Sequence, residues 1–497
     1  MGDLDRSAVH RGQSLCLARW TCRSLAVLLL LGCSSVICAA DRVNARLMQQ
    51  LTGRHDNARV MAIHSIGQDY QHRIEALPTV IAALNKLKED PRFKRSLDPD
   101  SPEILDGIVQ MIQFVGRVDV PESTDVLCSV LEMPNFTWVL AAAQTLGHHQ
   151  HHRAIDRLAK LIDSEHFKAS YGFRFTLARS LIEMNHPDGW ETLATLALSV
   201  DGQLAYLLEQ ECDRVTIDDF LGDQERYSAW RKSLGLDREP GQVSPAPRDL
   251  QSGTNALAKV LQNLQSNRQV AESEVEPTTD AGRPKLANTA PSADSLPKPT
   301  KMSLAADTTA ATYLREKRLH PSHYYGMEIY AKRLLFVLDR SGSMNALVYG
   351  QTRMQRAQRE LISAIEGLDE ECEFGILVFD TSVHQWRSEL VKADKKQKME
   401  AIRYVSNLVS GNRTNTYAAL RESLEFDAQV EAVFILTDGQ PTIGQLVNPS
   451  AILLDILRRN EFHNISINTI AIAVEPVMET FLRRLAEPSQ GECRVVD

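Results

Sequence analysis

The chain has 497 residues, of which 43% are hydrophobic, so it is long enough and apolar enough for two or three domains with buried cores. Its formal net charge is −9 at pH 7. A protein that neutralises phosphates needs a basic face, so this composition argues against a nucleic-acid-binding protein.

The first 40 residues have the pattern of a secretory signal peptide. Arg11, Arg19 and Arg23 precede an uncharged stretch from Leu25 to Ala40. These 16 residues are fewer than the ~20 that a membrane-spanning helix needs, and the small residues at their end offer a cleavage site. We therefore predict export to the periplasm, the cell envelope or the extracellular space, with a mature chain that begins near Asp41.

Two alternatives for this segment stay open. Leu30-Leu31-Gly32-Cys33 resembles the lipobox of bacterial lipoproteins, which would make Cys33 a lipid-anchored N-terminus, and an uncleaved segment would anchor the chain in a membrane. Four of the eight cysteines lie in this segment. The others, Cys128, Cys212, Cys372 and Cys493, contain no close pair, which favours isolated buried thiols.

Residues 41–238 show helical periodicity and almost no strand signal. Apolar helical segments come in pairs: the first member ends at Gly67, Gly116, Gly147 or Asn185, residues that suit left-handed C-caps, and the second covers 74–87, 123–131, 154–162 or 190–199. The recurrence resembles HEAT-type helical repeats and predicts an α-helical repeat domain. A plain helical bundle would give a similar pattern.

Four histidines, His148, His149, His151 and His152, fall where the two helices of one pair should turn. No carboxylate or cysteine is placed with them, and a zinc site needs further ligands. We therefore expect solvated turn histidines.

Residues 239–305 contain many prolines among Ser, Thr, Ala and acidic residues, a composition that predicts a disordered linker. Within it, Leu257, Val260, Leu261 and Leu264 stand at helical spacing. A short helix over 254–266 would be marginal alone, so we expect it to dock on a neighbouring part of the chain rather than to serve as a dedicated recognition helix.

The apolar run from Leu335 to Leu338 ends on Asp339, which is followed at alternate positions by Ser341 and Ser343. Such a run is typical of a parallel strand covered on both faces, and ligands bind at the carboxyl ends of such strands. One carboxylate and two hydroxyls are hard oxygen donors that suit Mg²⁺ or Mn²⁺.

Two later motifs supply further oxygens. Thr414 lies in a polar turn before a helical pattern, and Thr437-Asp438-Gly439 ends another apolar strand. In order and spacing, with Thr414 75 residues and Asp438 99 residues after Asp339, the set resembles the metal-ion-dependent adhesion site of von Willebrand factor type A domains.

The resemblance implies a metal site formed by Asp339, Ser341, Ser343, Thr414 and Asp438. In that family the serines and the threonine bind the ion, the aspartates bind it directly or through water, and a partner protein supplies a carboxylate to the vacant position. We expect Asp438 to act through water. The family commonly has Gly-Gly before the threonine, whereas this chain has Asn412-Arg413.

The other elements expected between residues 314 and 497 alternate between helix and strand. We predict helices over 353–368, 395–409, 418–424, 449–459 and 478–486, strands over 374–379, 432–436, 465–473 and 493–496, and an edge strand over 383–390. This alternation predicts a doubly wound, Rossmann-like α/β sheet, as in a type A domain. That fold separates Cys372 from Cys493, so no disulfide is expected between them.

No enzyme site emerges from these motifs. A haloacid-dehalogenase-type phosphotransferase would have Asp-x-Asp where this chain has Ser341, and a dinucleotide site would have Gly-x-Gly-x-x-Gly. Nucleophile elbows, zinc-protease motifs and P-loops are also missing from the sequence.

The sequence therefore predicts an exported, non-enzymatic protein that uses Mg²⁺, or Mn²⁺ or Ca²⁺, to bind an Asp or Glu of a partner protein. We expect no nucleic acid and no small-molecule substrate. Two alternatives remain: a scaffold that binds through its helical repeats, and an auxiliary subunit of an enzyme complex.

Overall fold

The computed structural model describes residues 44–67, 70–90, 106–234, 236 and 322–496. The predicted signal peptide, its lipidated alternative at Cys33 and the predicted linker with its helix over 254–266 lie outside these residues. The chain divides into two compact units, residues 1–145 and 146–497. Within the described residues, no helix combines the length and the apolar character needed to cross a bilayer.

The first unit is built from helices. They are α2 (Asp56–Ile66), α3 (Tyr70–Glu89), α4 (Asp106–Gly116), α5 (Pro121–Leu131) and α6 (Phe136–His148), whose last turn belongs to the second unit. Helix α4 packs against α2, α3 and α5 and buries Ile108, Ile112 and Val115. The predicted helical character of this region is confirmed, and the HEAT-type assignment stays a prediction.

The predicted left-handed caps are correct at one position of four. Asn185 has φ 42°, whereas Gly67 has φ −83°, and neither Gly116 nor Gly147 has a positive φ. Gly147 lies inside α6, where an added Cβ would stand 2.4 Å from Cα of Ser180. This glycine is therefore explained by the close approach of two helices, not by a turn.

The second unit begins with more helices: α7 (Ile155–Ala159), α8 (Glu165–Ala169), α9 (Tyr171–Met184), α10 (Pro187–Ala197), α11 (Gly202–Arg214) and α12 (Gln224–Ser233). The predicted helix over 154–162 is split, because α7 passes into the 3₁₀ turn η2 (Lys160–Asp163). Helices α11 and α12 were not predicted. Trp230 of α12 is fully buried, and its indole N–H donates to the carbonyl oxygen of Trp190 over 2.8 Å.

The histidine cluster is only partly solvated. His148 ends α6 with an exposed side chain, and the ring Nε2 of His152 lies 3.0 Å from the carbonyl oxygen of Met184. His151 is buried, so the prediction of a solvated turn histidine is wrong there. Its main chain turns back onto α6, since its N–H donates to the carbonyl oxygen of Leu146.

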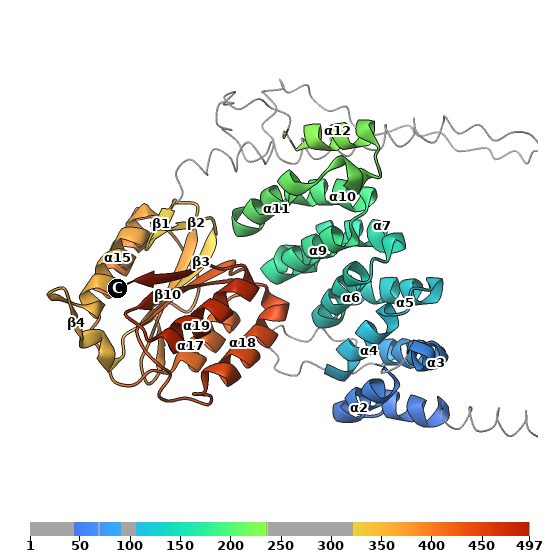
Figure 1. The fold of residues 1–497 in the computed structure, drawn as a ribbon, viewed down its shortest axis with the longest axis horizontal. Helices are drawn as coiled ribbons and strands as arrows, with labels where there is room; N and C mark the ends of the chain where they lie inside the picture. The colour runs from blue at the N-terminus through green and yellow to red at the C-terminus, as the bar shows by residue number, and fades with distance from the viewer. Residues whose placement is uncertain (1–43, 68–69, 91–105, 235, 237–321, 497) are drawn as a thin grey trace, which may run out of the picture. The chain divides into compact units, whose positions relative to one another are not determined.

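Residues 322–496 form a doubly wound α/β fold, which confirms the predicted fold class (Figure 1). Strand β3 (Arg333–Asp339) lies between β6 (Glu373–Phe379) and β9 (Ala432–Thr437), both parallel to it, and β10 (Ser466–Ile472) and β11 (Cys493–Val496) continue the sheet beyond β9. Two short strands, β7 (Val383–Gln385) and β8 (Val391–Lys392), pair antiparallel with β6.

Helices cover both faces of this sheet. One core contains side chains of α15 (Arg353–Gly367) and α16 (Lys395–Ser406), and the other contains side chains of α17 (Thr416–Glu425), α18 (Pro449–His463) and α19 (Pro476–Ala486). Residues of β3 alternate between the two cores, with Phe336 in the first and Val337 in the second. Burial on both faces explains the continuous apolar run that the sequence showed.

Several details differ from the predicted elements. Of the predicted edge strand over 383–390 only residues 383–385 form a strand, and a second short strand follows at 391–392; α16 ends at Ser406 rather than Val409. Two hairpins were not predicted: β1 (Ser322–Tyr324) with β2 (Met327–Ile329), and β4 (Leu347–Val348) with β5 (Gln351–Thr352). None of the four described cysteines is in a disulfide, and Cys212 and Cys372 are buried.

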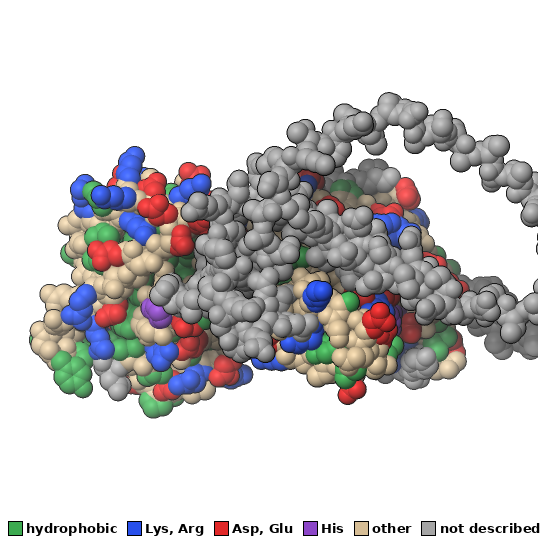
Figure 2. All heavy atoms as spheres, turned by 90° about the horizontal axis from the view of Figure 1, so that it is seen from above, with side chains coloured by type: hydrophobic (Ala, Val, Ile, Leu, Met, Phe, Trp, Pro, Cys, Tyr) green, Lys and Arg blue, Asp and Glu red, His purple; other side chains and the backbone are tan. Residues whose placement is uncertain are grey.

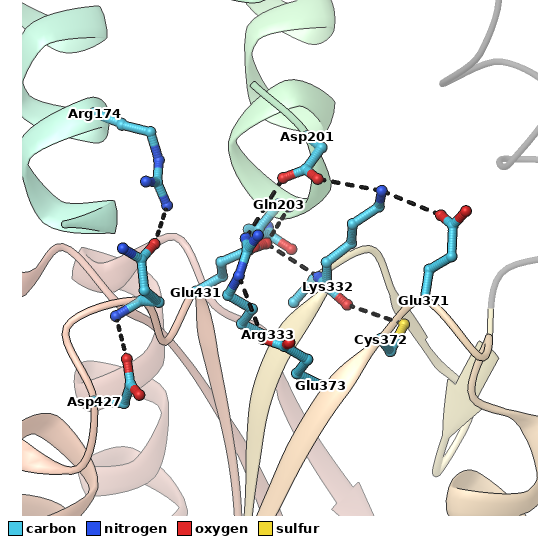
Figure 3. A network of polar contacts seen from close by, with 12 residues as sticks. Arg174, Asp201, Gln203, Lys332, Arg333, Glu371, Cys372, Glu373, Asp427 and Glu431 are labelled. Atoms are coloured by element: carbon cyan, nitrogen blue, oxygen red, sulfur yellow. Dashed lines mark hydrogen bonds and ion pairs between the residues drawn. The ribbon is translucent and has the colours of Figure 1, made fainter. Parts of the chain in front are cut away.

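The start of α11 contacts the residues just before β3 and β9, at the opposite end of these strands from Asp339, and α9 packs against α18 and the segment before β9. Figure 3 shows Asp201 and Gln203, at the start of α11, directed toward Lys332, Arg333 and Glu431. From α9, the N–H of Tyr171 donates to the carbonyl oxygen of Ala428 over 3.0 Å. No local sequence pattern predicts this contact.

The carboxylate of Glu431 is the centre of this contact. It is 1% exposed and accepts hydrogen bonds from the N–H groups of Gln203 and Lys332, at 2.8 and 3.1 Å, and from the guanidinium of Arg333 at 2.8 Å. Burial, aided by the charge of Asp201, raises the pKa of Glu431 to about 7 although these donors favour the charged form.

Candidate metal centre

Asp339 occupies the last position of β3 and is completely buried. Its Oδ1 accepts a hydrogen bond from the N–H of Ser341 over 2.7 Å, and its Oδ2 accepts one from the hydroxyl of Thr437 over 2.6 Å. Burial raises the pKa of Asp339 to about 6, although both hydrogen bonds favour the ionised form. The carboxylate is thus held in one orientation by groups from two neighbouring strand ends.

A chain of polar contacts leads from the first motif to the third. The hydroxyl oxygens of Ser341 and Ser343 lie 3.0 Å apart, and the Ser343 hydroxyl donates to Oδ1 of Asp438 over 2.7 Å. The other carboxylate oxygen of Asp438 accepts from Nη1 of Arg353 over 2.8 Å. Ser341 and Asp438 are buried whereas Ser343 is exposed, so these oxygens lie at a surface rather than in a closed interior.

The loop that carries Thr414 is tied to the first motif by its main chain. The N–H of Gly411 donates to the carbonyl oxygen of Arg340 over 2.5 Å, and the N–H of Gly342 donates to the carbonyl oxygen of Asn412 over 2.7 Å. Thr414 is 4% exposed, yet its hydroxyl makes no hydrogen bond within the described part of the chain. Because this oxygen is not among the buried side-chain atoms that lack a partner, it retains some accessible surface and is available to a ligand.

Gly411 allows the loop before Thr414 to approach Asp380 closely. A Cβ on Gly411 would stand 2.0 Å from Oδ2 of Asp380, so only glycine allows this approach. Asp380 also anchors the loop, because its carbonyl oxygen accepts from the N–H of Asn415 over 2.8 Å. Gly411, which approaches Asp380, lies three residues before Thr414. Asn412 and Arg413 fill the positions between Gly411 and Thr414.

Residues 334–440 match the von Willebrand factor type A domain family. The C-terminal part of this chain therefore contains a von Willebrand factor type A domain. Among proteins of known sequence, it is 29% identical over 171 residues to inter-alpha-trypsin inhibitor heavy chain H2 of Mesocricetus auratus, covering 32% of this chain and 17% of that protein. It is also 28% identical over 144 residues to heavy chain H4 of Homo sapiens, covering 26% and 15%.

These matches span less than a fifth of the length of the heavy chains. Among solved structures, a von Willebrand factor type A protein from Catenulispora acidiphila is 20% identical with a TM-score of 0.29, covering 34% of this chain and 40% of that one. The VWA domain of SpRpn10 is 14% identical with a TM-score of 0.27, covering 33% and 87%.

The donor set of the type A domain fits a hard divalent cation. It consists of oxygens alone, two from carboxylates and three from hydroxyls, which suits Mg²⁺, Mn²⁺ or Ca²⁺ rather than a softer metal. The described residues contain no group of three or more His, Cys, Asp and Glu side chains placed to hold a metal. A metal at this site would therefore depend on Ser341, Ser343 and Thr414.

Sequence reasoning missed two residues of this site. Asp380 directly follows strand β6, a position similar to that of Asp339, and this signal was available in the sequence. Arg353 begins α15, 85 residues before its partner Asp438, and nothing local connects the two. Only the fold brings this guanidinium to the carboxylate.

Proposed function

We propose that this type A domain holds a divalent cation at Asp339, Ser341, Ser343, Thr414 and Asp438 and uses it to bind an Asp or Glu side chain of a partner protein. The observation that carries the proposal is the Thr414 hydroxyl, which makes no hydrogen bond within the described residues and lies on a loop bonded to the Asp339 loop. When bound, the ion would supply the positive charge that a carboxylate needs.

Charge counting supports recognition of an anion. Asp339 and Asp438 carry two negative charges and Arg353 carries one positive charge, so the protein groups sum to −1. A divalent ion would bring the site to +1 and leave it attractive to one further carboxylate. Because Arg353 holds one oxygen of Asp438 and Ser343 holds the other, we propose that Asp438 reaches the ion through water.

We favour Mg²⁺ among the three ions. Hydroxyl and carboxylate donors with open positions for water match its usual protein sites, whereas Ca²⁺ takes six to eight oxygens. The surface agrees with a protein partner rather than nucleic acid. On the part of the type A domain visible in Figure 2, basic and acidic side chains are interspersed.

We further propose that the chain is exported with residues 1–40 as a signal peptide, that 41–238 form the helical domain, that 239–305 are a linker and that 314–497 form the type A domain. The similarity to inter-alpha-trypsin inhibitor heavy chains and to the type A family supports a binding role rather than catalysis.

The test is Mn²⁺ binding to the full chain, measured by electron paramagnetic resonance or calorimetry. We expect one ion per chain in the wild type, loss of that ion in Asp339→Asn, and no change in Glu389→Gln, which alters an exposed carboxylate of the same domain. Equal Mn²⁺ binding by wild type and Asp339→Asn would refute the site.

A further inference from the structure

A surface pocket of about 630 Å³ lies beside the proposed metal site. Arg340, Val378, His384, Arg403, Tyr404 and Val409 are among its lining residues. They come from the end of β3, from β6 and β7, and from α16 and the segment that follows it. All of these elements belong to the type A domain.

The pocket shares its walls with the metal site. Arg340 stands between Asp339 and Ser341, and its carbonyl oxygen holds the N–H of Gly411 over 2.5 Å. Val409, which lines the pocket, is followed directly in the chain by the loop that leads to Thr414. A ligand that reaches the metal site therefore lies next to the pocket.

One positive charge of the pocket is uncompensated. Arg340 pairs with Asp380 at 3.2 Å, and Glu400, another lining residue, pairs with Arg387 at 2.6 Å. Arg403 is exposed and makes no ion pair within the described residues. Its guanidinium is therefore available to a single negative charge from outside the chain.

The rest of the lining suits an acidic side chain on an aliphatic stem. Val378 and Leu408 give an apolar wall, and Val409 is 70% exposed, so it offers apolar surface at the pocket. Tyr404 adds a neutral phenol hydroxyl, whose pKa burial raises further above its ordinary value. One unpaired guanidinium beside apolar surface matches a monoanionic carboxylate better than a dianionic phosphate.

We infer that this pocket binds a second acidic side chain of the same partner, a few residues from the Asp or Glu that the metal site takes. Arg403 is the residue that selects it. The partner is thus a diacidic peptide segment. This inference rests on the proposed function, since the first carboxylate must be at the metal.

The probes are synthetic alanine-based peptides, fluorescently labelled and titrated with the full chain in Mg²⁺. One peptide carries a single Asp, and the others carry an Asp and a Glu separated by two, three or four alanines. We expect the best diacidic peptide to bind about three- to tenfold more tightly than the single-Asp peptide, the effect of one charged contact at a partly exposed site.

Arg403→Gln should remove this gain and leave the affinity for the single-Asp peptide unchanged. Arg484→Gln, which alters an exposed arginine of α19 that also has no ion pair within the described residues, should preserve the gain. Equal binding of single-Asp and diacidic peptides by the wild type would overturn the inference, as would a gain that survives in Arg403→Gln.

Two further outcomes separate this inference from the proposed function. Tighter binding of a phosphoserine peptide than of the Glu peptide would overturn the carboxylate assignment and leave the metal site standing. Binding of the single-Asp peptide that survives a chelator or Asp339→Asn, or no Mg²⁺-dependent binding of any peptide, would refute the proposed function itself and the inference with it.

Discussion

Gly411→Ala should weaken metal binding through a steric effect on the loop that carries Thr414. The new Cβ would stand 2.0 Å from Oδ2 and 3.0 Å from Cβ of Asp380. The side chain of Asp380 is not free to turn away, because its Oδ1 accepts from the N–H of Ser382 and its Oδ2 pairs with Arg340. The overlap is relieved only if the loop moves or these contacts break.

The size of the effect follows from the overlap. Real Cβ atoms essentially never stand closer than 3.0 Å to another heavy atom, so the loop or the carboxylate must shift by about 1 Å. Changes of this kind behind a metal ligand typically cost about 10- to 100-fold in metal affinity. This range corresponds to about 1.4 to 2.8 kcal/mol of binding free energy.

Gly439→Ala is the matched control. Gly439 directly follows Asp438, yet a Cβ there would meet nothing closer than Oγ of Ser343 at 3.6 Å, an ordinary contact. We expect Gly439→Ala to change Mn²⁺ affinity by less than about threefold, measured by calorimetry on the full chain, within the scatter of a substitution that creates no overlap. Equal affinities of the Gly411→Ala and Gly439→Ala variants would refute the reasoning.

Three further predictions concern charge and packing. Arg353→Gln should destabilise the metal-free fold in urea and tighten Mn²⁺ binding, because buried Asp438 loses its counter-charge; unchanged affinity would contradict this. Mn²⁺ affinity should fall about tenfold per pH unit below about pH 6, because Asp339 takes up a proton there. As the pH falls through the same range, the metal-free fold should gain stability relative to Asp339→Asn, because the pKa of Asp339 is higher in the folded than in the unfolded chain. Gly202→Ala should lower the free energy of unfolding in urea by about 2 to 4 kcal/mol, because Gly202 has φ 63° and the new Cβ would stand 2.1 Å from a buried carboxylate. Gly222→Ala should cost only about 1 kcal/mol, because Gly222 has φ 82° but open space around it. Equal costs would show that the steric overlap contributes nothing.

The contact of α9 and α11 with the type A domain leaves the metal site accessible. Lys332 and Glu431 lie at the amino ends of β3 and β9, whereas Asp339 and Asp438 lie at or beyond their carboxyl ends. The helices and the metal site therefore use opposite ends of the same two strands. A partner protein that binds at the metal does not have to displace these helices.

Parts of the candidate site were predictable because they are local. Asp339, Ser341 and Ser343 lie within five residues, and the apolar strand before them predicts their place at a sheet edge. Thr414 and Asp438 were recognised as further oxygen donors from a polar turn and a second apolar strand end, but only the family resemblance assigned them to one site, since no local pattern places a threonine 75 residues away beside Asp339. The structure joins their loops by main-chain hydrogen bonds and by the contact of Ser343 with Asp438.

The sequence by itself determined the α/β alternation, the burial of β3 on both faces and the oxygen character of the site, because hydrophobic periodicity and residue type are local properties. Tertiary structure decided which charges meet. Arg353 reaches Asp438, Arg340 reaches Asp380, and Glu431 is enclosed by α11 only after distant segments pack together. Such pairs depend on chain topology, and a linear pattern carries no distance between residues that are far apart in sequence.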